Sequence, residues 1–452
     1  MNRDSFGKDF VWGVSTAAYQ IEGAYDVDGK GLSIWDVFSK KKGKIRNGHH
    51  AELACDFYNR YEEDIRLMKQ LNIPHFRFSI AWTRILPKGV GEVNQEGINF
   101  YNRVIDQCLQ QGITPWLTLY HWDLPQALED KGGWTNRSIL DWFEEYVRIC
   151  IDAFGDRVQY WMVMNEPVAF VGAGYFFGKH APGRWGLRYF LPAVHHATLC
   201  MVRGAKLIKE RYPRALVGTT FSHSVLEPIS LKTRHINALR RADAIMNRLF
   251  LEPILGMGYP IDAVKALKNL KKYILPGDED HISFDFDFIG LQTYTREVVQ
   301  FSMLMPYVWA NIVEPRRRGV KHTTAMDWEI YPPSIYEALK RFQSYPNMPP
   351  IIITENGAAF KDEVVNDQVV DAERTKYLQD HIEQVLRAKE EGVDVRGYFV
   401  WTFTDNFEWA EGYHPRFGLV HVDFETQKRI VKGSGKWYGE WLSRDSLSSQ
   451  MV

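Results

Sequence analysis

The sequence predicts an α/β protein, a single (β/α)8 TIM barrel with long loops after its strands, spanning residues 1–452. Short apolar, β-rich runs recur eight times, and segments with helical periodicity lie between them. Alternating strands and helices of this kind build a parallel sheet, and eight such units close it into a barrel. No Gly/Ser linker, low-complexity tract or block of like charges interrupts the chain. We therefore expect one catalytic domain, because α/β barrels run to this length without dividing.

The eight predicted strands follow the apolar runs in order. They are residues 10–14, 75–80, 114–120, 158–164, 216–220, 286–291, 351–354 and 395–402. Helical periodicity is clear in several connecting segments, for example residues 61–70, 97–110, 138–153 and 375–389. The remaining length is expected in loops, chiefly residues 25–51 and 296–350.

Composition excludes several classes of partner. The formal net charge is only -1, so neither a nucleic acid nor an anionic membrane surface is indicated. No apolar run approaches the roughly 18 residues that a membrane span needs. The aromatic content is the unusual feature, at 14% with 15 Trp, and loop Trp side chains can form flat platforms for sugar rings.

The cysteines and the N-terminal residues indicate a cytoplasmic protein. Four widely spaced cysteines have no metal-ligand spacing and are expected to be small buried hydrophobes. The first ten residues lack the apolar segment of a signal peptide. The sequence leaves the oligomeric state open, a homo-oligomer included.

Two carboxylates lie where this architecture places its chemistry. The run Ile-Ile-Ile-Thr-Glu-Asn-Gly (351–357) carries Glu355 to the end of a buried strand, and Val-Gln-Tyr-Trp-Met-Val-Met-Asn-Glu-Pro (158–167) does the same for Glu166. The loops at the carboxyl ends of the strands build the active site of such a barrel. A pair of carboxylates at this end is what a carboxylate-pair hydrolase requires.

The other side chains that follow the apolar runs are rich in amides, carboxylates and Trp. They are Gln20, Glu22, Arg77, Trp82, His121, Trp122, Asn165, Tyr294, Asn356, Trp401, Glu408 and Trp409. The set contains no three-ligand His/Asp group for a metal and no Gly-rich phosphate loop. We therefore expect neither a metal nor a cofactor.

This set suits the cleavage of a glycosidic bond. One carboxylic acid protonates the leaving oxygen, and one carboxylate meets the developing oxocarbenium ion. A hydrogen bond from Tyr294 and the charge of Arg77 would keep one carboxylate ionised. A separation of roughly 5 Å between the carboxyls would give retention through a covalent intermediate, and a wider gap would give inversion.

Six motifs in order resemble glycoside hydrolase family 1, the group of β-glucosidases and β-galactosidases. They are Phe-Val-Trp-Gly-Val-Ser-Thr-Ala-Ala-Tyr-Gln-Ile-Glu-Gly (10–23), Phe-Arg-Phe-Ser-Ile-Ala-Trp-Thr-Arg-Ile (76–85), Leu-Tyr-His-Trp-Asp-Leu-Pro (119–125), Asn-Glu-Pro (165–167), Thr-Glu-Asn-Gly (354–357) and Asp-Asn-Phe-Glu-Trp-Ala-Glu-Gly-Tyr (405–413). Each motif alone is weak, but six in the family's order are specific. The resemblance covers nearly the whole chain.

The resemblance implies a retaining double displacement on a β-glycoside, with Glu166 as acid/base and Glu355 as nucleophile. It implies that Tyr294 and Arg77 contact the nucleophile and that Trp328 lines the leaving-group side. The sugar-binding set that it implies is Gln20, His121, Asn165 (at the 2-hydroxyl), Trp401 (under the sugar), Glu408 and Trp409. Trp122, beside His121, and Phe417 complete the predicted substrate-binding residues.

The chain departs from the family's pattern at two places. Gln292-Thr293-Tyr294 stands where the family commonly has Asn-Tyr-Tyr, and Ser222 stands where it often has Asn. Both changes affect the expected leaving-group side. The preferred aglycone therefore stays open, and so does the choice among glucose, galactose and fucose.

Three alternative functions remain. A 6-phospho-β-glycosidase of the same family would carry Ser, Lys and Tyr where this chain has Glu408, Pro415 and Phe417, so it ranks low. A transglycosidase shares the covalent intermediate and differs only in its acceptor. An inactive sugar-binding protein would have lost one of the two catalytic carboxylates, and both are present.

Some features have a structural explanation of equal or greater weight. We expect Trp134, Trp142, Trp161 and Trp437 to pack in the core and the arginine run 316–318 to be a solvated face. For His180 a structural role is at least as well supported as a role at the sugar.

Overall fold

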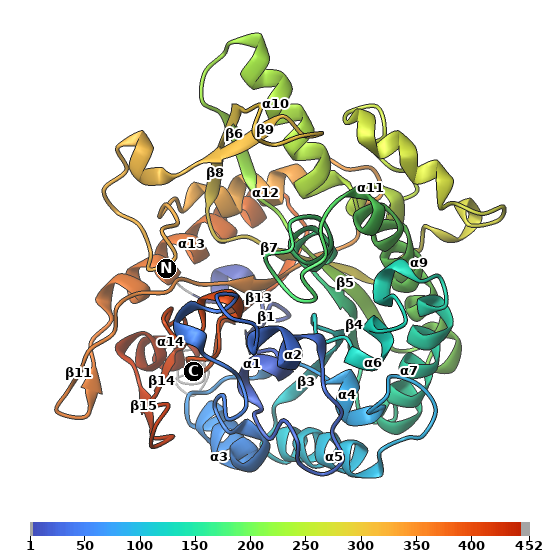
Figure 1. The fold of residues 1–452 in the computed structure, drawn as a ribbon. Coiled ribbons are helices and arrows are strands. Elements are labelled where there is room, and N and C mark those ends of the chain that lie inside the picture. Colours follow the sequence, from blue (N-terminus) through green and yellow to red (C-terminus); the bar gives the residue numbers. More distant parts are fainter. Residues whose placement is uncertain (1–2, 444–452) are drawn as a thin grey trace.

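The computed structural model describes residues 3–443, so the ends of the predicted 1–452 domain lie outside the described residues. It confirms the predicted barrel: eight parallel strands close in the order β1-β13-β10-β7-β5-β4-β3-β2 (Figure 1). These strands are β1 (Val11–Ser15), β2 (His75–Ser79), β3 (Thr114–Tyr120), β4 (Tyr160–Asn165), β5 (Leu216–Ser222), β7 (Phe288–Gln292), β10 (Ile351–Asn356) and β13 (Val395–Trp401).

Several strands run further than the apolar pattern predicts. β5 ends at Ser222 and β10 at Asn356, each two residues past the expected end. Ser222 pairs in register with Gln292 of β7, and Asn356 pairs with Val400 of β13. Backbone pairing therefore continues where the side chains have turned polar.

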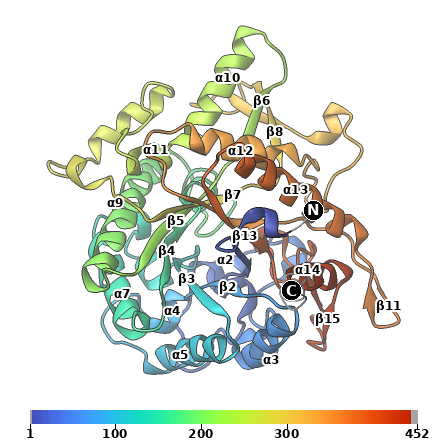
Figure 2. The same ribbon diagram turned by 180° about the vertical axis from the view of Figure 1, so that it is seen from behind.

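The four predicted helices are present with shifted ends. They are α3 (Phe57–Gln70), α5 (Gln95–Gln110), α7 (Ile139–Phe154) and α13 (Ala372–Glu390). Three more helices, α9 (Leu187–Arg211), α12 (Pro333–Gln343) and α14 (Gly433–Ser443), surround the barrel with them (Figure 2). The remaining α-helices of the described chain are α1 (Ala18–Ile21), α2 (Ile34–Ser39), α4 (Trp82–Ile85), α6 (Gln126–Glu129), α8 (Pro167–Val171), α10 (Thr233–Asp243) and α11 (Leu251–Ile254).

The two predicted long loops contain regular structure. Residues 25–51 include α2, and residues 296–350 include α12 and two strands. A three-stranded sheet joins β6 (Val225–Pro228), β8 (Arg296–Phe301) and β9 (Ala310–Val313), and α10 packs on it at the top of Figure 1. Two hairpins, β11 (Val364–Val365) with β12 (Gln368–Val369) and β14 (Val420–Val422) with β15 (Arg429–Val431), complete the strands.

The interior of the barrel is filled below the site by an apolar plug. Its members are Trp116, Met162, Phe288, Ile352 and Phe399. The Phe399 ring lies against Gly13 of β1, where an added Cβ would come within 2.5 Å of it. Arg77 rests directly on this plug, because its Nε lies 3.2 Å from the Met162 sulfur. The plug closes the barrel beneath the strand ends and leaves the polar residues above it.

A larger apolar core lies between the barrel and its helices. It includes Trp134 and Trp161, while Trp142 and Trp437 are partly buried against it, so the predicted packing role of all four is confirmed. The four cysteines are free and buried, as expected. Among residues 3–443, none of the helices combines the length and apolar character needed to cross a bilayer.

Candidate active site

Glu355 is held at the end of β10 by two charged or polar neighbours. Arg77 Nη1 donates to its Oε1 at 2.5 Å, and the Tyr294 hydroxyl donates to its Oε2 at 2.6 Å. Burial raises the pKa of Glu355, while the Arg77 guanidinium and the Tyr294 hydroxyl oppose that rise. Both contacts thus lower the pKa of Glu355, as predicted, but the rise caused by burial is larger.

Glu166 begins α8 in a left-handed backbone conformation, with φ 43° and ψ 68°. Pro167 follows and occupies the first turn of the helix, where its missing N–H costs nothing. Burial and then the charge of Glu355 raise the pKa of Glu166 well above its usual value. The larger rise is at Glu166, which lacks an arginine partner. The two environments therefore favour a proton on Glu166 rather than on Glu355.

Asn165 connects Arg77 to His121. Its Oδ1 accepts from Arg77 Nη2 at 2.5 Å and from Gln292 Nε2 at 2.8 Å, which directs its Nδ2 to His121 Nε2 at 3.0 Å. Because an amide nitrogen only donates, His121 Nε2 must accept and the ring proton lies on Nδ1. Burial lowers the pKa of His121 well below its usual value, so the ring is neutral. Its Nδ1–H is buried without a partner and is available to a sugar hydroxyl.

Gln20 and Glu408 form a second polar corner. Gln20 Nε2 donates to Phe407 O at 2.9 Å and to Glu408 Oε2 at 3.3 Å, while its Oε1 has no partner within the described chain. Burial raises the pKa of Glu408 to about 8, and the charge of Glu355 adds to the rise. The corner therefore offers both donors and acceptors, as a sugar with several hydroxyls requires.

Aromatic rings line the rest of the site. Trp401 packs in one cluster with Phe417, Tyr294 and Trp328, and the Tyr294 and Trp328 rings lie 5.2 Å apart. Trp122 and Trp409 lie 4.6 Å apart, and Trp122 Nε1 donates to the Asn165 carbonyl at 3.0 Å. Trp122 thus holds the backbone of Asn165 and packs against Trp409 in the aromatic wall of the site.

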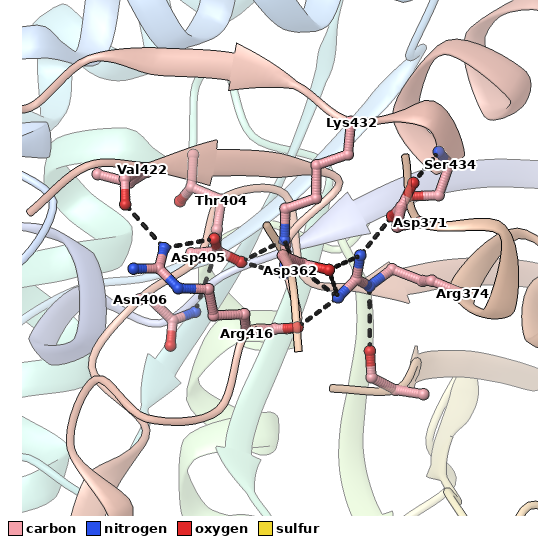
Figure 3. Close-up of polar contacts among 12 residues, drawn as sticks. Asp362, Asp371, Arg374, Thr404, Asp405, Asn406, Arg416, Val422, Lys432 and Ser434 are labelled. Atoms are coloured by element: carbon pink, nitrogen blue, oxygen red, sulfur yellow. Dashed lines mark hydrogen bonds and ion pairs between the residues drawn. The ribbon is translucent and has the colours of Figure 1, made fainter. Parts of the chain in front are cut away.

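A buried ionic cluster lies behind the loop that carries Glu408 and Trp409, and the sequence motifs do not indicate it. Asp405 accepts from Lys432 at 2.6 Å and from Arg416 at 2.9 Å (Figure 3). Lys432 also donates to Asp362, which in turn accepts from Arg374. Burial raises the pKa of Asp405, but Lys432, Arg416 and Arg374 together hold it below its usual value. The members lie 11 to 70 residues apart along the chain, so no local pattern reveals them.

Two of the residues that follow the apolar runs do not join the site. Glu22 accepts from Arg84 at 2.6 Å and from Tyr101 at 2.6 Å within the packing behind β1. Trp82 is fully buried and stacks on Tyr146 at 4.6 Å.

The structure also shows where the arginine run 316–318 and His180 lie. Arg316 and Arg317 have exposed side chains, as predicted, but the expectation of a uniformly solvated run is wrong for Arg318. Arg318 Nη2 donates to Glu329 at 2.7 Å, beside Trp328. His180 packs against Trp35 and Trp122 at 5.3 and 5.9 Å, which is a structural position behind the wall.

The chain matches the family model described as glycosyl hydrolase family 1 over residues 2–446. It belongs to glycosyl hydrolase family 1. Among curated proteins of this family, Beta-glucosidase A of Thermotoga maritima is 45% identical over 99% of this chain and 100% of its own length. Beta-glucosidase A of Acetivibrio thermocellus is 44% identical, over 99% of this chain and 100% of its own.

Solved structures of the family have the same fold. The family 1 β-glucosidase from Thermotoga maritima aligns with a TM-score of 0.91 and 44% identity, over 97% of this chain and 98% of that one. The same enzyme in complex with deoxynojirimycin also gives 0.91 and 44%, with the same coverage. The predicted family is thereby shown, and the barrel with it.

Proposed function

We propose that the chain is a retaining β-glucosidase that removes terminal non-reducing β-D-glucosyl residues, with one catalytic domain. The observation that carries the proposal is the unequal pair: Glu355 bonds Arg77 and Tyr294, whereas Glu166 makes no ion pair with an arginine of residues 3–443 and has the larger rise in pKa. The relatives in the family are named β-glucosidases, which supports glucose as the sugar. Galactose and fucose are proposed as further substrates because they differ from glucose only at hydroxyls.

In the proposed mechanism Glu166 donates its proton to the glycosidic oxygen while the Glu355 carboxylate attacks the anomeric carbon. The aglycone leaves as an alcohol, and the sugar remains bound to Glu355 as an ester. Glu166, now ionised, takes a proton from water, and the resulting hydroxide character displaces Glu355 with overall retention. Asn165, His121, Gln20 and Glu408 would hold the sugar hydroxyls, and Trp401 would contact the sugar face.

The geometry also weighs against a phosphorylated sugar. Glu408 has a pKa of about 8, so its charge alone is not the argument against phosphate. The nearby cations Arg416 and Lys432 are both committed to Asp405 in the buried cluster. The side chains of Pro415 and Phe417 supply no donor. A 6-phosphate would therefore lack a partner.

A chromogenic aryl β-glucoside tests the proposal. Glu355→Gln should lower kcat by at least ~10⁴-fold, because it removes the group that forms the intermediate. Glu166→Ala should lose roughly 10²–10⁴-fold on substrates with poor leaving groups and less on activated ones. Azide should restore turnover of Glu166→Ala and give β-glucosyl azide, whereas an α-configured product would contradict retention.

A panel of aryl β-glucoside, galactoside, fucoside and 6-phosphoglucoside would rank the sugars. A preference for the 6-phosphoglucoside would reverse the ranking proposed above. If wild type and Glu355→Gln were equally inactive on the whole panel, an inactive sugar-binding protein would be the better explanation. Product analysis at high sugar concentration would separate hydrolysis from transglycosylation.

A cytoplasmic location is part of the proposal. The four cysteines are free and buried, as is usual where thiols stay reduced. No nucleic-acid or membrane partner is proposed, because the net charge is -1.

A further inference from the structure

Gln292 is the last residue of β7, at a place where the chain departs from the family's Asn, and its side chain is fully buried. It pairs in register with Ser222 of β5 and with Glu355 of β10. Gln292 therefore lies level with the proposed nucleophile at the carboxyl ends of the strands. It belongs neither to the catalytic nor to the sugar-binding residues that the sequence predicts.

The direction of the Gln292 amide follows from its neighbours. A guanidinium carries only donors, so the Asn165 atom that lies 2.5 Å from Arg77 Nη2 must be the oxygen Oδ1. Gln292 contacts the same oxygen at 2.8 Å, so the contacting atom of Gln292 must be the donor Nε2. Two donors thus converge on Asn165 Oδ1, and they leave Asn165 Nδ2 facing His121 Nε2 at 3.0 Å.

Gln292 gives the Asn165 amide a second anchor. The last torsion of an Asn side chain is broad, and one hydrogen bond at its oxygen leaves the plane of the amide free to turn. The other donor, Arg77, also bonds Glu355 through Nη1, and its Nε lies 3.2 Å from Thr118 Oγ1. Donors from two strands, β2 and β7, therefore fix the plane of the Asn165 amide, and without Gln292 only Arg77 would hold its oxygen.

The extra methylene of Gln292 brings this donor within reach of Asn165. β7 carries Gln292 and β4 carries Asn165, and β5 lies between them in the barrel. Neighbouring strands are about 4.8 Å apart, so the contact spans roughly two strand spacings. An Asn at position 292 would place its amide about 1.5 Å further back on the same backbone. The 2.8 Å bond would then open beyond hydrogen-bond distance.

The oxygen of the Gln292 amide has no partner of its own. This Oε1 is buried without a hydrogen bond within residues 3–443, as are Gln20 Oε1 and His121 Nδ1. A buried polar atom without a partner costs free energy, so such atoms indicate a group supplied from outside the chain. Gln20 and His121 are proposed to bind sugar hydroxyls, and Gln292 shares this property beside Asn165.

We propose that Gln292, through its extra methylene, is a positioning residue that holds the Asn165 amide for the 2-hydroxyl of the bound sugar. It sets selectivity at that carbon and not on the leaving-group side, where the sequence alone places this departure. The inference rests on the proposed function, in which Asn165 holds a sugar hydroxyl, the 2-hydroxyl by the family resemblance. Hydrogen bonds to the 2-hydroxyl of a glycoside strengthen in the transition state, so the effect should appear in kcat/KM.

The experiment compares kcat/KM for 4-nitrophenyl β-D-glucoside and its 2-deoxy analogue, which share one leaving group. Gln292→Met keeps the length of the side chain and removes its donor, whereas Gln292→Asn keeps the donor and removes the length. Each variant should lower the ratio of glucoside to 2-deoxyglucoside about twofold to tenfold, as expected for one hydrogen bond. Gln110→Met, at an exposed glutamine at the end of α5, is the matched control and should keep the wild-type ratio.

The ratio separates positioning of Asn165 from a general weakening of the site. Gln292 also lowers the pKa of Glu355 through its side chain, and the loss of that contact changes the rates of both substrates alike. An equal fall for both substrates, or a wild-type ratio in Gln292→Asn, would overturn the inference. Either can occur while wild type hydrolyses the aryl β-glucoside normally, and then the proposed function stands. Failure of wild type to hydrolyse any β-glucoside would instead overturn the proposed function, and this inference with it.

Discussion

At the scale of single residues, Tyr294 and Arg77 set how readily Glu355 ionises. The Tyr294 hydroxyl donates to Glu355 at 2.6 Å and lowers the pKa of that carboxyl. Tyr294→Phe removes this bond, so the pKa of Glu355 should rise further. A hydrogen bond to a charged group contributes about 1.5–3 kcal/mol, which corresponds to a shift of roughly one to two pH units.

The acidic limb of the pH profile of kcat/KM should therefore move to higher pH in Tyr294→Phe. The basic limb, which the proton on Glu166 governs, should move less. An unchanged acidic limb would show that Tyr294 does not act on the ionisation of Glu355. Tyr336→Phe, which removes an exposed hydroxyl bonded to Glu391, is the matched control and should leave both limbs in place.

The sequence could predict which residues meet at the site, but not the tautomer or the pKa that each one has there. Glu166, Asn165 and Glu355 follow from the rule that function lies at the carboxyl ends of the strands. The Nδ1–H form of His121 depends on which way Asn165 points, and that depends on Arg77 and Gln292. The pKa of Glu408 depends on burial by segments distant in sequence. Such properties arise only when the chain has folded.

At the scale of elements, the buried cluster of Figure 3 anchors the loop that carries Glu408 and Trp409. Lys432 lies between Asp362 and Asp405 and is fully buried. Lys432→Met keeps the length of the side chain but leaves two carboxylates without their shared cation. Breaking a buried pair in this way costs about 3–5 kcal/mol, so Tm should fall clearly.

A second measurement, of KM and kcat, separates anchoring of this loop from general stability. Lys432→Met should also raise KM for the aryl glucoside more than it lowers kcat, because the displaced loop carries sugar contacts and not the catalytic pair. Lys428→Met is the control: its ion pair with Asp367 is exposed, 53% and 75%, and its loss should change stability by less than about 1 kcal/mol. Equal Tm values for the two variants would contradict the anchoring role.

The elements that the sequence analysis missed are those without a strong apolar period. β8 reads Arg-Glu-Val-Val-Gln-Phe, and β6 has four residues and ends in Pro. Their pairing is non-local, since Val225 lies opposite Arg296. Apolar side chains of this sheet pack against α10, and together with the α8 segment these elements enclose an apolar cavity.

At the scale of the whole molecule, eight apolar runs and the helices between them were enough to predict the barrel. Each run is a strand buried on both faces, so it appears in the sequence without reference to its neighbours. The protonation states of the folded molecule cannot be predicted in the same way, because burial changes the pKa of side chains that are ordinary acids in the sequence. Asp123 is one of them: neither of its carboxyl oxygens has a partner within the described chain, and burial raises its pKa to about 8.

This burial predicts a contribution to stability that is lost as the pH rises from about 4 to about 8. Asp123 and Glu408 both have folded pKa values of about 8, far above the roughly 4 of an unfolded chain. A raised folded pKa contributes stability that is fully present below the unfolded pKa and is lost as the pH rises through the folded one. The buried histidines oppose this loss near pH 6.5, because His75 and His381 have folded pKa values lowered to about 4, whereas an unfolded imidazole still binds part of a proton there. Above about pH 7.5 the unfolded imidazoles are neutral as well, and the two carboxyls set the sign. Each such carboxyl should cost about 1.4 kcal/mol per pH unit between the two pKa values, and less as the pH passes its folded pKa.

Asp123→Asn isolates one of these contributions. The amide cannot ionise, so between pH 6.5 and 8.5 the change of Tm with pH should be less negative in this variant than in wild type, by about the share of one group. Asp262→Asn, at a side chain 94% exposed, is the control and should keep the wild-type slope. Thermal unfolding at closely spaced pH values measures all three slopes. A slope that Asp123→Asn leaves unchanged would show that Asp123 is ionised in the folded protein.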